Sequence, residues 1–506
     1  MKNLLVLPSA AGGNVVNTGN TAEQAALFLN STGTIFRKGG KVMSLEKDLL
    51  VEVKPPMAET MLFSLMNVQK WAGRGQNVNL VPATEIKDTT LHAILEGHYV
   101  KQHIREITVV ARRPYLVLSG DTLVSLQVGY NPERGGILVT GKDMPVEVPL
   151  EEAVPAISAL FDDFHFATPS DRSRAIAAVL CAALRMAGIY ERHPLLVFEA
   201  DFSQTGKTLL WAMLCAIFGQ RYGSVVQKRG GVGSLDETLM DKLVAGHGFI
   251  LYDNVRGRVD SPFLEACLTP ETGDLDARVL GRKIPVDPRP VVIGMTSNAA
   301  EVTSDLANRS FMVRICKQPG HYKFRVWTNE KGEEVGIREH IESRQAYYHG
   351  CVNAIVRDWW AKGAQRLPCT EHSFKQTIGA LDFMTQTYFK TPPLLDGHQG
   401  ALDRTSMPGL SWLRHIAIEA CNRWHVVDWT ASKLAERCAL NGIVIPGANG
   451  PVESMAAAQL VGVAMANAFG TAESITVDGA VVVSRKVEKD SKGRDYKLYS
   501  FTKVGG

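Results

Sequence analysis

Three absences narrow the class of this protein before any motif is considered. Its eight cysteines are scattered and form no CxxC pair, which argues against a zinc site or a disulfide framework and favours a reducing cytosol. No apolar run approaches the ~18 residues of a membrane-spanning helix, and the short apolar start does not predict a signal peptide. We therefore expect a soluble cytoplasmic protein that has no membrane partner.

The sequence also lacks a large excess of charge of either sign. The 55 lysines and arginines nearly balance the 52 acidic residues, and the net charge is only +3. A basic surface for nucleic acid must therefore come from local clusters. With 45% hydrophobic and 21% charged residues the composition is that of an ordinary globular protein, and its length predicts about two to four domains.

What the sequence does contain is an incomplete phosphate-binding motif at residues 195–210. Leu195 to Phe198 is apolar and predicts a buried strand, a polar turn follows, and Gly206-Lys207-Thr208 opens a helical pattern. Backbone N–H groups at such a helix start bind phosphate, the lysine adds charge for the β- and γ-phosphates, and the threonine hydroxyl suits Mg²⁺. We therefore predict ATP and Mg²⁺ as cofactors. The residues expected to contact the nucleotide are Ser203, Gln204, Thr205, Gly206, Lys207, Thr208 and Leu209.

Two later strands each end in polar residues that suit the same site. Gly248 to Asp253 predicts a buried parallel strand with a carboxylate at its C-terminal edge, where ligands bind in open α/β sheets. Asp253 is predicted to hold Mg²⁺, although a surface aspartate after a strand is the alternative. The strand at 290–298 ends in Asn298, whose amide can orient the attacking water. Arg309 heads the next strand and serves either in a structural ion pair or as an arginine finger.

The order and compact spacing of these motifs resemble superfamily 3 helicases of the AAA+ class. The closer resemblance is to the replicative ATPases of phages, plasmids and pathogenicity islands. The strings that are also similar to that group are Arg37–Gly40, Gly129–Pro132, Asp253–Ser261 and Asp276–Arg282. The likeness covers most of the chain and is firmest over residues 150–315.

The resemblance implies an α/β fold with an AAA+ P-loop ATPase core. It also implies that the protein assembles into a ring-shaped homo-hexamer with nucleotide sites between its subunits. Lys207, Asp253 and Asn298 would be catalytic within one subunit, with Thr208 and Asp253 as metal ligands, and Arg309 would act on the neighbouring subunit's nucleotide. The implied function is an ATP-dependent DNA helicase or translocase that replicates a mobile genetic element in the cytoplasm of a bacterial host cell. A separate primase or initiator is a further expected partner.

The resemblance also implies a role for the basic segment 278–283. It should form a hairpin that projects into the channel of the ring, where Arg278, Arg282 and Lys283 would grip the phosphate backbone of single-stranded DNA. An ordinary solvated basic turn is the alternative.

Two departures from the family pattern concern hydrolysis. Asp201 replaces the glycine that lets the loop approach the phosphates, and its carboxylate would repel them unless Mg²⁺ or a basic group offsets it. Asn254 stands where many AAA+ proteins have the catalytic glutamate, and an amide cannot act as a general base. Either Asp260 or Glu265 polarises the water or hydrolysis is slow. The alternative function is therefore a nucleotide- and DNA-binding replication-initiation or assembly factor with little ATP turnover, and a metabolic P-loop kinase is a third.

The chain divides by pattern into five expected regions. They are an N-terminal α+β domain (1–145), a helical collar or lid (146–193), the ATPase core (194–318), a helical region (319–428) and a winged-helix domain (429–506). In the first region we expect a loose lead-in over 1–20, a hairpin over 35–45 whose Arg37, Lys38 and Lys41 form a solvated turn rather than a nucleic-acid contact, and a helix near 57–72.

The winged helix is predicted from helices at 430–440 and 453–468 followed by β runs at 480–488 and 496–502. The wing is rich in basic residues that suit a duplex backbone. Those predicted to bind DNA are Arg485, Lys486, Lys492 and Arg494. A purely structural wing is the alternative.

Overall fold

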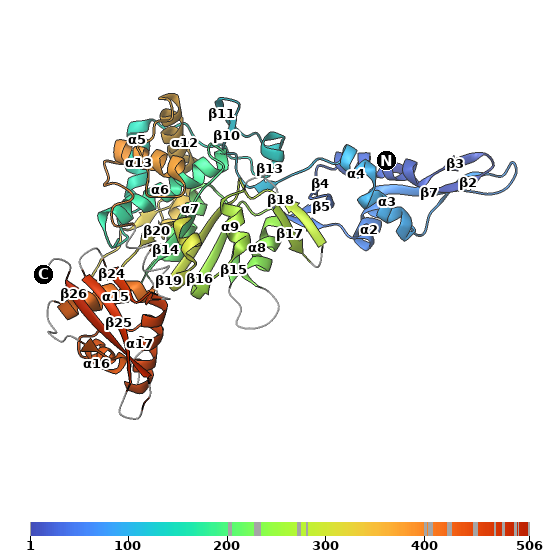
Figure 1. The fold of residues 1–506 in the computed structure, drawn as a ribbon. Helices are drawn as coiled ribbons and strands as arrows, with labels where there is room; N and C mark the ends of the chain where they lie inside the picture. Colours follow the sequence, from blue (N-terminus) through green and yellow to red (C-terminus); the bar gives the residue numbers. More distant parts are fainter. Residues whose placement is uncertain are drawn as a thin grey trace. The chain divides into compact units, whose positions relative to one another are not determined.

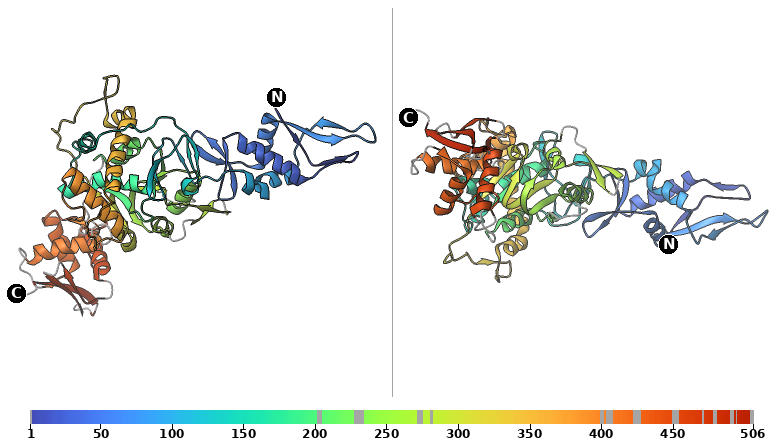
Figure 2. Two further views of the ribbon diagram at one scale, coloured as in Figure 1. Left: turned by 90° about the horizontal axis from the view of Figure 1, so that it is seen from above. Right: turned by 60° about the horizontal axis from the view of Figure 1, so that its bottom comes forward.

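The protein is described from a computed structural model (Figures 1 and 2). The structure describes residues 2–200, 205–226, 234–270, 275–279, 282–398, 402, 408–421, 428–448, 454–469, 472–477, 481–489, 493 and 495–503. Proximity of Cα atoms divides the chain into two compact units, which we describe separately. The first is Met1–Arg256, Ser261–Asn298 and Arg309–Leu394, and the second is Gly257–Asp260, Ala299–Asn308 and Leu395–Gly506. No helix of the described ranges has both the length and the apolar character that crossing a membrane requires.

The N-terminal part of the first unit combines small sheets with short helices. Its elements are β1 (Asn3–Val6), β2 (Ser9–Ala11), β3 (Asn14–Val16), α1 (Thr18–Ser31), β4 (Ile35–Lys38), β5 (Lys41–Glu46), β6 (Leu49–Glu52), α2 (Pro55–Leu65), β7 (Met66–Ala72), β8 (Asn79–Pro82), α3 (Asp88–Glu96), α4 (His98–His103), β9 (Val109–Ala111), β10 (Leu116–Ser119), β11 (Thr122–Ser125), β12 (Gly129–Asn131) and β13 (Ile137–Val139).

Two expectations for this part were wrong. The first residues are not a loose lead-in, because β1 pairs in parallel with β7 and buries Leu5 in the core under α1. The predicted helix at 57–72 ends at Leu65, and Met66–Ala72 is the strand β7. Met66 and Val68 are buried on one face of that strand, so the two-residue repeat of a strand prevails there over the helical pattern. The hairpin at 35–45 is found as β4–β5.

A five-stranded sheet forms the centre of the first unit within the described residues. Its strands are β14 (Leu195–Glu199), β15 (Tyr222–Val226), β16 (Phe249–Val259), β19 (Val292–Val302) and β20 (Ser310–Arg314), in the order β15-β16-β19-β14-β20. β14 pairs in parallel with both β19 and β20, and β15 pairs in parallel with β16. The strand that follows β14 in sequence therefore lies at the far edge, which makes the carboxyl end of β14 a topological switch point.

Helices cover this sheet and fix the position of its central strand (Figure 1). They are α5 (Leu150–Ala159), α6 (Pro169–Ala187), α7 (Lys207–Ile217), α8 (Leu235–Val244) and α9 (Pro262–Leu268). α6 is buried along almost its whole length, as its apolar sequence predicts. The Thr168 hydroxyl caps its first turn, and Gly188 ends it at φ 70°, a backbone conformation that glycine adopts readily.

The rest of the first unit is helical, as expected for this region. It contains β21 (Trp327–Thr328), β22 (Glu334–Val335), α11 (Ile337–Ser343), α12 (Gln345–Ala361) and α13 (Lys375–Phe389). α12 packs on α5 and α6, and Trp359 within it is fully buried.

The second unit ends with the predicted order of two helices and a β-hairpin. Its elements are α10 (Ser304–Asn308), α15 (Pro408–Glu419), β23 (Asp428–Trp429), α16 (Ala431–Leu440), α17 (Ser454–Phe469), β24 (Ser474–Val477), β25 (Val481–Lys489) and β26 (Asp495–Lys503). The strands form one sheet in the order β23-β26-β25-β24. Trp429, Val461, Val483 and Tyr499 lie in a core shared by this sheet and the helices.

Candidate functional site

The predicted phosphate loop lies between β14 and α7, at the switch point of the central sheet. Asp201, Ser203 and Gln204 fall outside the described residues. Gly206 precedes the first residue of α7 at φ 96° and ψ 8°. A Cβ atom on Gly206 would lie 3.0 Å from Cε1 of Phe164, so both the backbone conformation and the close ring favour glycine there. The chain thus turns from β14 into a helix whose first N–H groups have no helical acceptor.

Lys207 is the first residue of α7, and the residue is only 8% exposed. Its Nζ donates a hydrogen bond to Oγ1 of Thr205, 3.2 Å away. Burial lowers the pKa of Lys207, and the carboxylate of Asp253 opposes this shift. An ammonium held beside a phosphate loop is the arrangement expected for a lysine that binds phosphate.

Asp253 lies at the centre of a small hydrogen-bond network. Its Oδ1 accepts from the Thr208 hydroxyl at 3.3 Å and from the Thr296 hydroxyl at 2.8 Å. The Thr296 hydroxyl also accepts from the backbone N–H of Asn254 at 2.7 Å. The structure therefore brings the two predicted metal ligands, Thr208 and Asp253, into contact. Thr296 was not predicted, although it stands two residues before Asn298 and alternation along the strand could have indicated it.

A hard divalent cation fits this pair of oxygen donors. Mg²⁺ is usually bound in proteins by one or two oxygen side chains together with water and substrate phosphates, and a hydroxyl and a carboxylate beside a phosphate loop supply that set. Within the described residues no three His, Cys, Asp or Glu side chains gather as ligands, so a metal that depends on a full protein cage has no candidate there.

Asn254 has an unusual backbone for a residue within a strand. Its φ is +50°, in the left-handed region that asparagine tolerates better than most residues. Its N–H donates to the Thr296 hydroxyl, so the backbone turns directly after Asp253. Sparsely populated conformations of this kind cluster at functional sites.

The last two sequence-predicted catalytic residues, Asn298 and Arg309, lie toward opposite ends of the sheet's strands: Asn298 at the carboxyl edge, where the phosphate loop begins, and Arg309 at the amino edge. Asn298 belongs to β19, but its side chain lies outside the described residues. The strand does not end at Asn298, as predicted, but continues to Val302, and Ser297 pairs with Glu199 at the end of β14. Arg309 precedes Ser310, which pairs with Leu195 at the start of β14. β14 has five residues, about 16 Å at ~3.3 Å per residue, so Arg309 lies roughly that far from the phosphate-loop edge.

Arg309 is bound within its own chain at this amino edge. Its Nη1 donates to the main-chain oxygen of Glu265 within α9 at 3.0 Å and to Oγ1 of Thr269, directly after that helix, at 3.1 Å. This places Glu265 at the same edge as Arg309, away from the phosphate loop of its own subunit.

A cavity of about 550 Å³ opens beside the phosphate loop and was missed by sequence reasoning. Thr205, Gly206 and Leu209 form one side of it. Three other segments, residues 163–165, 317–327 and 335–337, form the rest of the lining, and their aromatic and basic side chains include Phe164, Tyr322, Phe324, Arg325 and Trp327. Cavities of this size, mostly apolar with a few polar groups, are typical small-molecule sites.

The wall of this cavity formed by residues 316–327, here named the strap, is held by the loop before α6. The Asp163 carboxylate accepts from the Tyr322 hydroxyl at 2.9 Å and from the Arg325 N–H at 3.1 Å. The backbone N–H of Cys316 donates to the His165 oxygen at 2.7 Å. These contacts could not be read from the sequence, because the partners are more than 140 residues apart.

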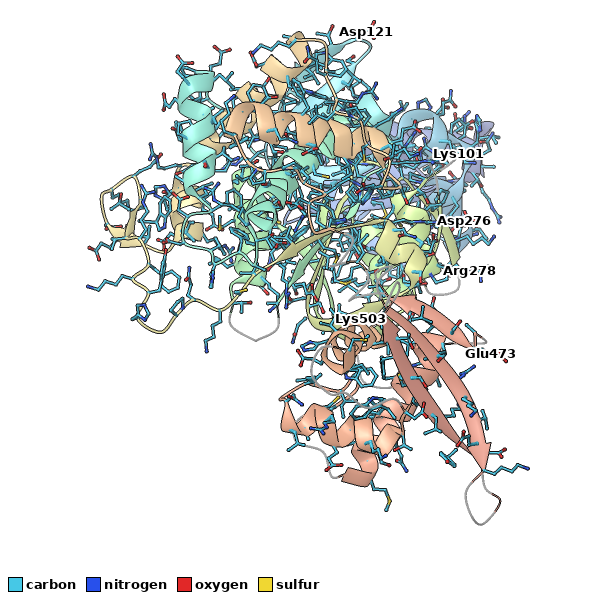
Figure 3. The ribbon with its side chains drawn as sticks, turned by 60° about the vertical axis from the view of Figure 1, so that its left-hand side comes forward. Lys101, Asp121, Asp276, Arg278, Glu473 and Lys503 are labelled. Atoms are coloured by element: carbon cyan, nitrogen blue, oxygen red, sulfur yellow. The ribbon has the colours of Figure 1, made fainter. Side chains whose placement is uncertain are left out.

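The basic segment 278–283 forms the predicted hairpin, with β17 (Leu275–Val279) antiparallel to β18 (Arg282–Val286). Figure 3 marks Asp276 and Arg278 on β17. Lys283 is exposed and forms an ion pair with Asp276 at 3.2 Å, and Arg278 opposite it is also exposed. The side chain of Arg282 lies outside the described residues. An ion pair between two exposed groups is weak, so it leaves Lys283 accessible to a phosphate.

The N-terminal hairpin β4–β5 packs against this β17–β18 hairpin, so the predicted solvated turn is wrong. A Cβ atom on Gly39 would clash with Cγ2 of Ile284, and Lys38 is 4% exposed. Its Nζ donates to the main-chain oxygens of Leu243 at 2.5 Å and Thr108 at 2.6 Å. Burial lowers the pKa of Lys38 to about 7, with a smaller opposing effect of Asp287.

The basic residues of the wing do not form one surface. Arg485 pairs with Tyr499 and Lys486 with Leu498, so these neighbours point to opposite faces of the β25–β26 ladder. Arg485 lies 5.2 Å from the centre of the Phe469 ring, and Lys486 forms an exposed ion pair with Glu488 at 2.7 Å. Lys492 and Arg494 fall outside the described residues.

Comparisons with known proteins leave the chain without a family. The sequence matches no protein-family model and no curated protein. Two solved structures, both described as the A form apo structure of the NrS-1 C-terminal region, are similar at low level. One has 12% identity and a TM-score of 0.35 over 85% of this chain and 93% of that one. The other, residues 305–718 of NrS-1, has 10% identity and a TM-score of 0.38 over 94% and 100%. Likeness at this level establishes neither a shared fold nor a shared function.

Proposed function

We propose that the protein is an ATP-dependent DNA helicase or translocase with an AAA+ P-loop ATPase core. The observation that carries the nucleotide part is the contact of the Thr208 hydroxyl with the Asp253 carboxylate, directly behind the turn that leads into Lys207. Lys207 and Thr208 from the start of α7 and Asp253 from β16 converge where the phosphate motif predicts triphosphate and metal.

Each residue then has a defined task in binding. The N–H groups at the start of α7 and the Lys207 ammonium hold the phosphates, and Thr208 with Asp253 would hold Mg²⁺, which neutralises charge on the transferring phosphoryl group. Thr296 fixes the Asp253 carboxylate through its hydroxyl. The base would enter the cavity between the loop and the strap, where Phe164 and Phe324 offer ring faces for stacking.

The DNA part of the proposal is supported by Arg278 and Lys283 on the β17–β18 hairpin. Both are exposed, and the hairpin directly precedes β19, which contributes Thr296 to the Asp253 network. A basic hairpin next to a strand of the proposed nucleotide site suits sequence-independent, salt-sensitive contact with a phosphate backbone.

The test is ATPase activity and strand displacement with and without single-stranded DNA, in wild type, K207A and K70A. Lys70 lies on β7, outside the nucleotide site, and serves as the matched control. We expect DNA-stimulated hydrolysis in wild type and K70A that is lost in K207A. Equal activity in K207A, or no stimulation by DNA in wild type, contradicts the proposal.

The ring is tested by mixing subunits. Since Arg309 lies at the edge opposite the phosphate loop, it can reach a nucleotide only on another subunit. A mixture of K207A and R309A subunits forms some interfaces that combine an intact loop with an intact arginine. Activity recovered in the mixture supports action between subunits; a mixture as inactive as its components excludes it.

One observation favours a second function, a nucleotide- and DNA-binding assembly factor with little turnover. The residue after Asp253 is an asparagine, which provides no general base. Tight Mg²⁺-ATP binding that promotes assembly, with negligible phosphate release in the presence of DNA, would select this function.

A further inference from the structure

A second cavity, of about 560 Å³, lies at the other end of α7. Its apolar wall is the C-terminal half of that helix, with Ala212, Cys215 and Ala216. α7 has 11 residues, so at ~1.5 Å per residue this cavity lies about 16 Å from the phosphate loop. It is therefore a separate site and no extension of the nucleotide cavity.

Four arginines from three separate segments line this cavity. They are Arg112 and Arg113 after β9, Arg221 before β15, and Arg338 on α11. Three of them have a carboxylate partner: Asp48 for Arg112, Asp143 for Arg113 and Glu342 for Arg338. Four guanidiniums against three carboxylates make a net charge of +1.

The ion pairs leave much of the donor capacity of these arginines unused. Asp48 and Glu342 are each bound through the Nε atom of their arginine, at 3.0 and 2.8 Å. The structure shows no ion pair or hydrogen bond of the Arg221 side chain with any described residue. Nη groups in a planar fork are the donors that bind phosphate in bidentate fashion.

The carbonyl groups at the end of α7 accept hydrogen bonds from groups other than these arginines. Cations often cluster at a helix C-terminus to satisfy its last carbonyls, which would be the ordinary explanation here. However, Gln220 N–H donates to the Cys215 oxygen at 2.9 Å and Gly219 N–H to the Ala216 oxygen at 3.0 Å. The Gln345 side chain donates to the Ile217 oxygen at 3.0 Å. The helix end is thus bonded without any guanidinium.

We propose that this cavity is an anion site for a phosphate-bearing ligand, bound by Arg221 and by the Nη groups of Arg112 and Arg338. The shared chemistry is a phosphodiester or pyrophosphate group, which a DNA strand and a free nucleotide both carry. A volume within the ~300–1,000 Å³ range of ligand pockets accommodates one nucleotide unit. The site is independent of the nucleotide site proposed above.

The test uses full-length protein that also carries K207A, so that the phosphate loop contributes little. The affinities for inorganic pyrophosphate and for a fluorescent single-stranded oligonucleotide are measured by titration for R221Q, R338Q and the control R74Q. Arg74 is exposed in a turn and away from the cavity, and its replacement makes the same change of charge. Thermal unfolding confirms that all variants are folded.

We expect R221Q and R338Q each to weaken binding of at least one probe by about 10-fold or more relative to R74Q. If the ligand is a strand, oligonucleotide affinity falls and its log–log salt slope decreases by ~0.7 for each phosphate that the variant no longer neutralises. If the ligand is a free nucleotide, pyrophosphate binding falls and the oligonucleotide is unaffected. Affinities of R221Q and R338Q equal to those of R74Q for both probes overturn the proposal, whatever the ATPase assay shows.

Discussion

Replacing Thr296 by valine tests the role of the Asp253 network in metal binding. Valine has nearly the shape of threonine, so the fully buried position within β19 keeps its packing while it loses the hydroxyl. Two hydrogen bonds are removed, one at 2.8 Å to the Asp253 carboxylate and one at 2.7 Å from the Asn254 N–H. Removal of the second leaves a backbone donor without its acceptor.

The magnitude follows from these two bonds. Removing one partner of a buried hydrogen bond costs about 1–3 kcal/mol, so we expect the free energy of unfolding of T296V to fall by that amount. Outer-shell partners of metal ligands typically change metal affinity about 10–100-fold, and the same decrease is expected for Mg²⁺-ATP because Asp253 is freed to rotate.

The assay is ATP binding by calorimetry in excess Mg²⁺ and again in EDTA. T296V should be weaker only in Mg²⁺, since Lys207 and the start of α7 bind the phosphates directly. T296S keeps the hydroxyl and should restore most of the affinity. The reasoning is refuted if T296V binds Mg²⁺-ATP as wild type does, or if T296S is as weak as T296V.

Three further predictions follow from single side chains. The folded-state pKa of Lys38 is lowered to about 7 from 10.5, so between these pH values the unfolded chain holds a proton that the folded chain has released. The free energy of unfolding of wild type should therefore rise with pH across that window, by up to about 5 kcal/mol relative to K38M. F324A should weaken ATP binding about 10-fold through reduced stacking but leave tripolyphosphate binding unchanged, since Phe324 is 64% exposed and its replacement does not disturb the core. R309A should keep ATP affinity and lower turnover, since its bonds lie at the opposite edge of the sheet.

Each of these has a contradicting result. Denaturation curves of wild type and K38M that run parallel from pH 7 to 10.5 would show that Lys38 keeps an ordinary pKa. Equal decreases of ATP and tripolyphosphate affinity in F324A would mean that the strap does not hold the base. A large decrease of ATP affinity in R309A would place the nucleotide at the wrong edge of the sheet.

The parts of the candidate site that lie along one stretch of chain could be predicted from local sequence patterns. The strand from Leu195, the turn at Gly206 and the helix that follows are each encoded by neighbouring residues, and the structure has them where the sequence placed them. The four apolar residues before Asp253 equally predicted a buried strand there, although β16 does not end at Asp253 but continues to Val259.

Long-range burial could not be predicted in the same way. Lys38 appears on a turn that its own neighbours mark as exposed, and only the oxygens of Leu243 and Thr108 explain why it is buried. The strap has no regular pattern, and it forms a cavity wall because Asp163 holds Tyr322 and Arg325 from 159 and 162 residues away.

In the wing, by contrast, the sequence alone could have shown which basic residues share a face, although counting its positive charges did not. Arg485 and Lys486 are adjacent in a strand, so alternation alone places them on opposite faces. On the face with Arg485, Lys489 and Lys497 follow at alternate positions of β25 and its partner β26. That face also carries the buried Val483 and Tyr499, so it packs on the core near Arg485 and is exposed farther along, at Lys489 and Lys497, whereas Lys486 lies on the opposite face.

The phosphate-loop residues and Arg309 lie at opposite ends of the strands of the central sheet. Lys207, Thr208 and Asp253 gather at the carboxyl edge, while Arg309 lies at the amino edge, one five-residue strand away. α7 spans the same separation, and the arginine-lined cavity begins where that helix ends. A single subunit therefore cannot bring these guanidiniums to its own phosphate loop. Any contribution they make to phosphate chemistry requires a second ligand or a second subunit, and the pyrophosphate titration and the mixed-subunit assay distinguish these two.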